Sequence, residues 1–158
     1  MDESIYEMLR ELVEKREYKE LKEHLVDMAY PDIAEFIMSL EDEKTAVTVF
    51  RILPKDISAD VFSYLDSDSQ ETIVRLITDK EIERLMDDLY VDDAVDFLEE
   101  VPAGVVRRVL ANTDKETREI INRFLEYPDT SAGSIMTIEM VELHDRLTVG
   151  EAIKSIRR

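Results

Sequence analysis

Two consecutive twelve-residue blocks, KTAVTVFRILPK at residues 44–55 and DISADVFSYLDS at residues 56–67, carry the pattern that decides the fold. In both blocks the third residue is small and the sixth, seventh and tenth residues are apolar. These positions are spaced i, i+3, i+4 and i+7, which puts them on one face of an α-helix. Each block therefore predicts one short amphipathic helix that ends in a tight joint.

The same pattern runs through eight blocks, from residue 32 to residue 127. The sixth position is apolar in every block: Ile37, Val49, Val61, Ile73, Leu85, Phe97, Val109 and Ile121. The seventh position fails once, at Asn122, and the tenth holds Glu41 and Thr113 as exceptions. A short helix cannot bury such a stripe alone, whereas a stack of helices can. The repeat predicts an all-α, right-handed superhelical solenoid of about ten short antiparallel helices, built from hairpins of about 24 residues.

The flanks of the repeat predict further elements. Residues 3–14 and 17–29 read as two opening helices, and Asp32 is expected near the N-cap of the next one, after Pro31. Other joints are expected at Asp42, Pro54, 66–69, 78–79, Asp92, Pro102 and 113–114.

The character of the chain changes after Pro128. Residues 140–143 predict a short β-strand, and residues 148–157 predict a helix capped by Thr148. One strand and one helix have no sheet to pack on, so the chain is expected to stop inside its next module. We divide it into a helical domain at 1–127, a connector at 128–137 and the truncated start of an α/β domain at 138–158.

Composition excludes several classes of function. The chain has 38 acidic and 20 basic residues and a net charge of −18, which disfavours nucleic acid and anionic lipid as partners. Because there is no cysteine, disulfides and thiolate sites are excluded. No dinucleotide loop, P-loop, zinc-protease helix or nucleophile elbow occurs, so we expect no enzyme. No apolar run approaches the roughly 18 residues of a membrane span.

The placement of carboxylates is the informative polar feature. Residues 87–100 contain seven acids and no base, and Asp92 and Asp96 share a helix face at i, i+4, as do Asp56 and Asp60. Helix capping and solvation explain such pairs in part. The alternative is a weak site for Mg²⁺ or Ca²⁺, whose remaining oxygen ligands would come from a second surface.

Several segments together resemble the cytosolic N-terminal domain of MgtE-type magnesium transporters. They are the acidic solenoid, the Leu53-Pro54-Lys55 joint, the stretch YVDDAVDFL at 90–98 and the connector YPDTSAGSIMT at 127–137. Residues 136–153 are similar to the opening of a cystathionine-β-synthase-type (CBS) domain, which follows the solenoid in that family.

The resemblance implies a function. Members are homodimeric membrane Mg²⁺ channels whose N-terminal and CBS domains sense Mg²⁺ at the cytoplasmic face of the membrane, and ions held between the two acidic domains favour pore closure. The positions here that match the family's ligands are Asp60, Asp92 and Asp96, with Asp93 as an outer neighbour. The resemblance also implies Mg²⁺ as a weakly bound regulator, and the CBS and membrane domains of the same full-length chain as partners.

A second interpretation stays open. The middle domain of the FliG motor-switch protein has a similar architecture, and a solenoid of that kind docks proteins. In that case the acids would only solvate the surface, with no metal role.

Overall fold

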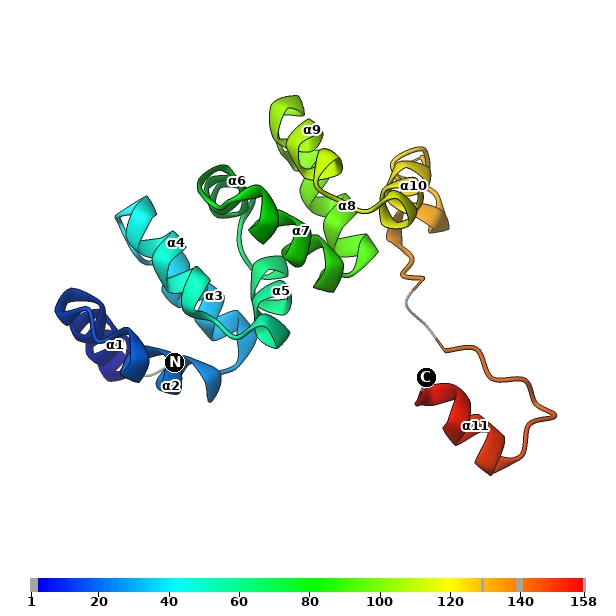
Figure 1. Cartoon of the computed structure of the whole chain (residues 1–158), viewed down its shortest axis with the longest axis horizontal. Coiled ribbons are helices and arrows are strands. Elements are labelled where there is room, and N and C mark those ends of the chain that lie inside the picture. The colour runs from blue at the N-terminus through cyan, green and yellow to red at the C-terminus, as the bar shows by residue number, and fades with distance from the viewer. Residues whose placement is uncertain (1–2, 129, 139–140, 158) are drawn as a thin grey trace.

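The structure, a computed structural model, describes residues 3–128, 130–138 and 141–157. Short α-helices stack side by side along the long axis of the molecule, and α11 lies apart from them (Figure 1). The helices are α1 Glu3–Lys15, α2 Tyr18–Val26, α3 Tyr30–Met38, α4 Glu43–Ile52, α5 Lys55–Ser63, α6 Ser67–Leu76, α7 Asp79–Asp88, α8 Val91–Glu100, α9 Ala103–Ala111, α10 Lys115–Phe124 and α11 Val149–Ile156, with a 3₁₀ turn at Ala132–Ile135. The described residues contain no strand, and the predicted all-α solenoid is confirmed. Its handedness stays a prediction.

The joints between helices recur at the predicted spacing of twelve residues. The N-caps of α4 to α10 are Asp42, Pro54, Asp66, Thr78, Tyr90, Pro102 and Asp114. Side-chain oxygens cap four of these helices, as when Asp42 accepts from Thr45 N at 2.8 Å. These bonds satisfy N–H groups that lack an intrahelical partner.

Two predicted joints are shifted. α3 begins at Tyr30 with Ala29 as its N-cap, so Asp32 lies inside the first turn. Pro31 is tolerated there because first-turn N–H groups need no intrahelical acceptor. Likewise Tyr90 is the N-cap of α8, and Asp92 is already helical. The sequence pattern misplaced both starts because an acidic residue stabilises the first turn of a helix as well as its cap.

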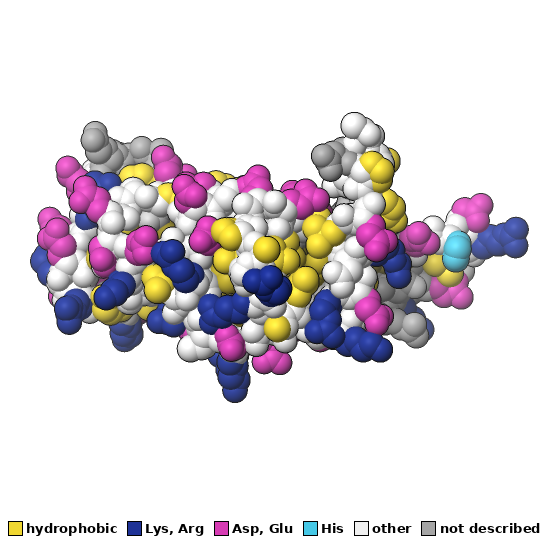
Figure 2. Space-filling view, turned by 90° about the horizontal axis from the view of Figure 1, so that it is seen from above, with side chains coloured by type: hydrophobic (Ala, Val, Ile, Leu, Met, Phe, Trp, Pro, Cys, Tyr) yellow, Lys and Arg dark blue, Asp and Glu magenta, His cyan; other side chains and the backbone are white. Residues whose placement is uncertain are grey.

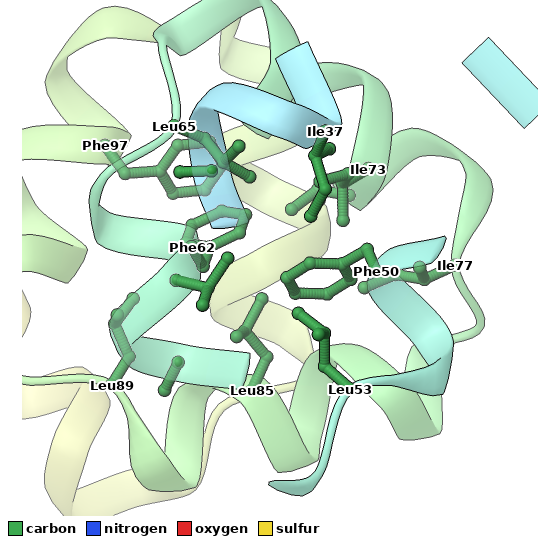
Figure 3. Packing of buried hydrophobic residues seen from close by; sticks show 14 of the residues in the cluster. Ile37, Phe50, Leu53, Phe62, Leu65, Ile73, Ile77, Leu85, Leu89 and Phe97 are labelled. Carbon is green, nitrogen blue, oxygen red and sulfur yellow. The ribbon is translucent and has the colours of Figure 1, made fainter. Parts of the chain in front are cut away.

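The apolar stripe forms one continuous core. All eight residues at the sixth repeat position are buried. Figure 3 shows how their neighbours interlock, with Phe62 of α5 between Phe50 of α4 and Phe97 of α8. At the tenth position Thr113 is buried although it is polar, because its hydroxyl donates to the Val109 carbonyl oxygen at 2.9 Å.

Helices two apart in the sequence pack against each other. α3 contacts α5, α4 contacts α6, α5 contacts α7, and α8 contacts α10. Since successive N-caps are twelve residues apart, these contacts follow the predicted 24-residue unit. Contacts also join some helices that are three apart, such as α6 and α9, so each helix packs only on helices close to it in the sequence, as in other solenoids.

The C-terminal region differs from the prediction in one respect. Residues 141–143 form no strand, and Met140 lies outside the described residues. Among the described residues the segment has no neighbouring strand with which to share backbone hydrogen bonds. The predicted helix is present as α11, with Thr148 and Glu151 forming a capping box, and its apolar residues Val149, Ile153 and Ile156 are exposed. The domain boundaries at 127/128 and 137/138 stay predictions.

The N-cap carboxylates predict an acid-sensitive stability. The hydroxyl of Thr117, together with the N–H groups of Thr117 and Glu116, holds the pKa of Asp114 below its ordinary value. A group whose pKa is lower in the folded state stabilises the fold above its unfolded pKa, and this contribution disappears as the pH falls through the folded pKa. Asp114→Asn keeps the accepting oxygen but has no charge to lose. We therefore expect its melting temperature to fall less than that of the wild type when the pH is lowered from about 7 to about 3.

Circular dichroism at each pH measures this effect. Glu23→Gln, at an exposed site on α2, is the control and should follow the wild type. Parallel losses in all three proteins would contradict the role of the Asp114 charge.

Candidate functional site

Helix α8 carries several acidic residues and no basic residue. Asp92, Asp93, Asp96, Glu99 and Glu100 all lie on this ten-residue helix. Asp92 and Asp93 occupy its first turn and are half-buried, whereas Asp96 is exposed. The positive end of the helix dipole stabilises the first two carboxylates, but the repulsion among the five stays uncompensated within the helix.

A hollow between α5, α6 and α8 brings some of these acids together with others. It has a volume of ≈ 270 Å³, and its acidic lining consists of Asp66, Asp93, Asp96 and Glu100. The hydroxyl of Ser67 contacts a carboxylate oxygen of Glu100 at one edge. Beneath them Gln70 is buried, with its Nε2 donating to the Phe62 carbonyl oxygen at 2.9 Å. The hollow therefore has a neutral floor and negative walls.

Asp92 lies outside the lining of this hollow. Its Oδ1 is buried, and no hydrogen bond from the described residues reaches it. A buried polar atom without a partner is rare, because it has lost its hydration without compensation. A cation or a donor from a further surface would remove that cost once the half-buried side chain turned this oxygen outward. The Asp92 carboxylate thus fits the chemistry of an ion ligand.

Asp60 lies on α5 and is half-buried. Lys55 pairs with Asp88 at 3.0 Å and Ser67 contacts Glu100, and both pairs span 33 residues. Asp60 and Asp93 lie on α5 and α8, a pair of helices that neither of these two contacts joins.

The four predicted site residues therefore do not converge on one point. Asp93 and Asp96 share the hollow, whereas Asp60 and Asp92 are not part of its lining. In the part of the chain that the structure describes, no three His, Cys, Asp or Glu side chains are arranged to hold a metal ion. A complete coordination shell would need oxygens from outside this domain or from water, as the sequence predicts for Mg²⁺.

Sequence reasoning missed Asp66 and Glu100 as neighbours of the predicted site. Asp66 is identifiable only as an N-cap, and Glu100 only as the end of an acidic run. Ser67 and Glu100 are 33 residues apart, as are Lys55 and Asp88. This interval could have indicated Glu100, but it becomes known only from the Lys55–Asp88 pair in the structure. Among the described helices, none has the length and apolar character required to cross a bilayer.

An elongated stack of short helices with one strongly acidic helix defines the class of this protein as an acidic helical-repeat domain. The family model described as MgtE intracellular N domain matches residues 28–130, and the chain belongs to this family. The expected resemblance is thereby confirmed. Since the matched region contains α3 to α10, it contains every predicted site residue.

Known relatives agree with this assignment. A Thermus thermophilus protein named magnesium transporter MgtE is 27% identical over 161 residues, which cover 100% of this chain and 36% of that protein. The chain thus spans about a third of the length of this curated relative. A crystal structure of the soluble part of a magnesium transporter superposes with a TM-score of 0.85 at 24% identity, covering 98% of this chain and 61% of the other. The cytosolic domain of the Mg²⁺ channel MgtE in complex with ATP gives 0.80 at 25% identity, covering 94% and 61%.

Proposed function

We propose that this chain is the cytosolic regulatory domain of a magnesium transporter. In this proposal it senses Mg²⁺ through ions held between its acidic face and the acidic surface of an adjoining CBS domain, and the bound state favours pore closure. The single observation that carries the proposal is α8, a helix with five acids, no base and a buried, unpaired Asp92 oxygen. Membership of the MgtE family supports it.

The electrostatics of the acidic face suit such a switch. Two negative surfaces repel each other, and a divalent cation placed between them reverses the sign of the interaction. Each ion bound only in the compact state stabilises that state by RT ln(1 + [L]/Kd). Several weak sites therefore sum to a switch that responds to an abundant ion.

The residues divide into roles within this proposal. Asp60, Asp92 and Asp96 are the ligands of this domain, and Asp93 holds water molecules of the ion's hydration shell. Mg²⁺ commonly keeps several waters while one or two carboxylates contact it, so ligands spread over one face suffice. Asp66 and Glu100 add negative charge beside Asp96. The CBS and membrane domains of a homodimeric full-length chain would be the partners, at the cytoplasmic face of the cell membrane.

The test uses the complete soluble region, with the helical and CBS domains together. Asp92→Ala combined with Asp96→Ala is expected to weaken Mg²⁺ binding by about tenfold or more in isothermal titration calorimetry, because one charged ligand contact is worth at least about 1.4 kcal/mol. Mg²⁺ should also slow trypsin cleavage of the wild type and reduce its radius in small-angle scattering.

Glu23→Ala combined with Asp27→Ala is the matched control, with the same spacing and the same change in charge at exposed positions of α2 and its C-cap. This control should bind Mg²⁺ as the wild type does. Equal dimensions of the wild type in chelator and in saturating Mg²⁺ would overturn the sensor function. A protein partner bound equally well in both conditions would then favour the docking interpretation.

A further inference from the structure

A groove with a basic rim crosses the surface between α4, α5 and α7. Its floor is apolar and includes Phe50 and Leu85, and its rim carries three bases, Arg51, Lys55 and Arg84, and one acid, Glu81. The volume of the groove is ≈ 170 Å³. Figure 2 shows Lys and Arg side chains beside hydrophobic ones over the middle of the face that it draws, with Asp and Glu side chains above and below them. This face therefore carries a group of basic side chains although the chain has a net charge of −18.

The three basic rim residues differ in their existing partners. Arg51 already donates to Glu81 at 2.9 Å and to the Leu76 carbonyl oxygen at 3.2 Å. Lys55 pairs with Asp88. Arg84 is exposed, and no hydrogen bond or ion pair joins it to a described residue. Its guanidinium is therefore available to an acidic group from another molecule.

The joint between α7 and α8 carries acidic and aromatic side chains, which are complementary to the bases and the apolar floor of the groove. Residues 87–93, here called the acidic corner, place Tyr90 between two pairs of aspartates. Tyr90 is 52% exposed although it is large and aromatic, and its side chain does not cap α8. Asp87 beside it is exposed as well. An exposed aromatic ring flanked by carboxylates matches a groove with an apolar floor and a basic rim.

The groove and the corner are adjacent on the same surface, because the Lys55–Asp88 pair at 3.0 Å joins the rim of one to the start of the other. A surface that carries both halves of a complementary contact side by side can meet its own copy about a two-fold axis. Each copy then offers its corner to the partner's groove, and both contacts close at once.

We propose that a second copy of this chain docks on this surface, with Tyr90 of each copy in the basic groove of the other and Asp87 facing Arg84. The groove is large enough for one ring, since a protein cavity of about 150 Å³ holds benzene. The contact is small, and the two copies repel each other through their net charge. The dimer is therefore weak and transient, and tethering in a longer chain would strengthen it.

A charge swap tests the docking directly. Arg84→Glu and Asp87→Arg should each abolish self-association. In the first variant residue 84 and Asp87 of the other copy are both acidic, and in the second Arg84 and residue 87 of the other copy are both basic. A mixture of the two variants restores both pairs and should form a heterodimer. Sedimentation velocity of this chain up to about 1 mM, the range of effective concentrations in tethered systems, measures each case in chelator. Arg107→Glu, an exposed site on α9, is the control and should self-associate normally.

A wild type that sediments as a monomer throughout this range would overturn the docking proposal, and so would a mixture that fails to associate. Because these measurements contain no Mg²⁺, their outcome is independent of the proposed function. A second measurement rests on that function: Mg²⁺ on Asp92 competes with the groove for the acidic corner. Wild-type self-association should then weaken by about tenfold in saturating Mg²⁺, and an unchanged dissociation constant would contradict this coupling alone.

Discussion

Phe62→Ala is expected to lower the free energy of unfolding by about 3–5 kcal/mol, the largest single effect that we foresee. Phe62 is 1% exposed, and its ring lies 6.1 Å from that of Phe50 and 5.2 Å from that of Phe97. It thereby joins three helices, α4, α5 and α8 (Figure 3). Truncation removes apolar burial and both ring contacts, and leaves a cavity that a stack of short helices cannot refill without shifting its neighbours.

Chemical denaturation followed by circular dichroism measures this loss. Tyr64→Ala is the matched control, since Tyr64 is an aromatic residue two positions away that is 54% exposed at the end of α5. It should cost less than about 1 kcal/mol. Equal losses for the two variants would show that Phe62 does not occupy the core.

Arg108→Ala is expected to cost about 2–3 kcal/mol through the loss of a charged hydrogen-bond network. The guanidinium of Arg108, on α9, donates to the carbonyl oxygens of Val74 at 2.6 Å and Ile77 at 2.8 Å. It also bonds Asp79 through Nε at 2.9 Å and Nη2 at 2.8 Å. One side chain thus caps the C-terminal end of α6 and binds the first turn of α7, and its removal leaves these groups without that partner.

The neighbouring residue provides the control. Arg107 is exposed on the same helix, so Arg107→Ala should change stability by less than about 0.5 kcal/mol. Arg108→Lys should recover only part of the loss, because an ammonium cannot reproduce the planar fork. Thermal and denaturant unfolding compare the three variants. Full stability of Arg108→Lys would mean that charge alone, and not the fork, holds this junction.

The helices could be predicted well, and the reason is local. A twelve-residue repeat with apolar residues at i, i+3, i+4 and i+7 is a short-range signal, and the sixth position is buried throughout. The predicted starts of α3 and α8 were shifted, because several residue types can begin a helix. Ala29 and Tyr90 act as N-caps without a side-chain bond, whereas the acids that follow them stabilise the first turn.

The candidate site was predictable only in part. The acidic run on α8 can be read directly from the sequence, and the family resemblance singled out Asp60, Asp92, Asp93 and Asp96. Two features of the site depend on contacts between helices about 30 residues apart. One is the hollow that Asp93 and Asp96 share with Asp66 and Glu100, and the other is the buried oxygen of Asp92. No local pattern contains those contacts.

The sequence by itself determined the number of helices, their buried faces and the excess of negative charge, because these follow from periodicity and composition. Only the tertiary structure decided which charges meet. The register between neighbouring helices pairs Lys55 with Asp88 and Arg108 with Asp79, and leaves Arg84 exposed beside the acidic corner. That register depends on how apolar side chains interlock across the stack, which is a property of three-dimensional packing and not of spacing along the chain.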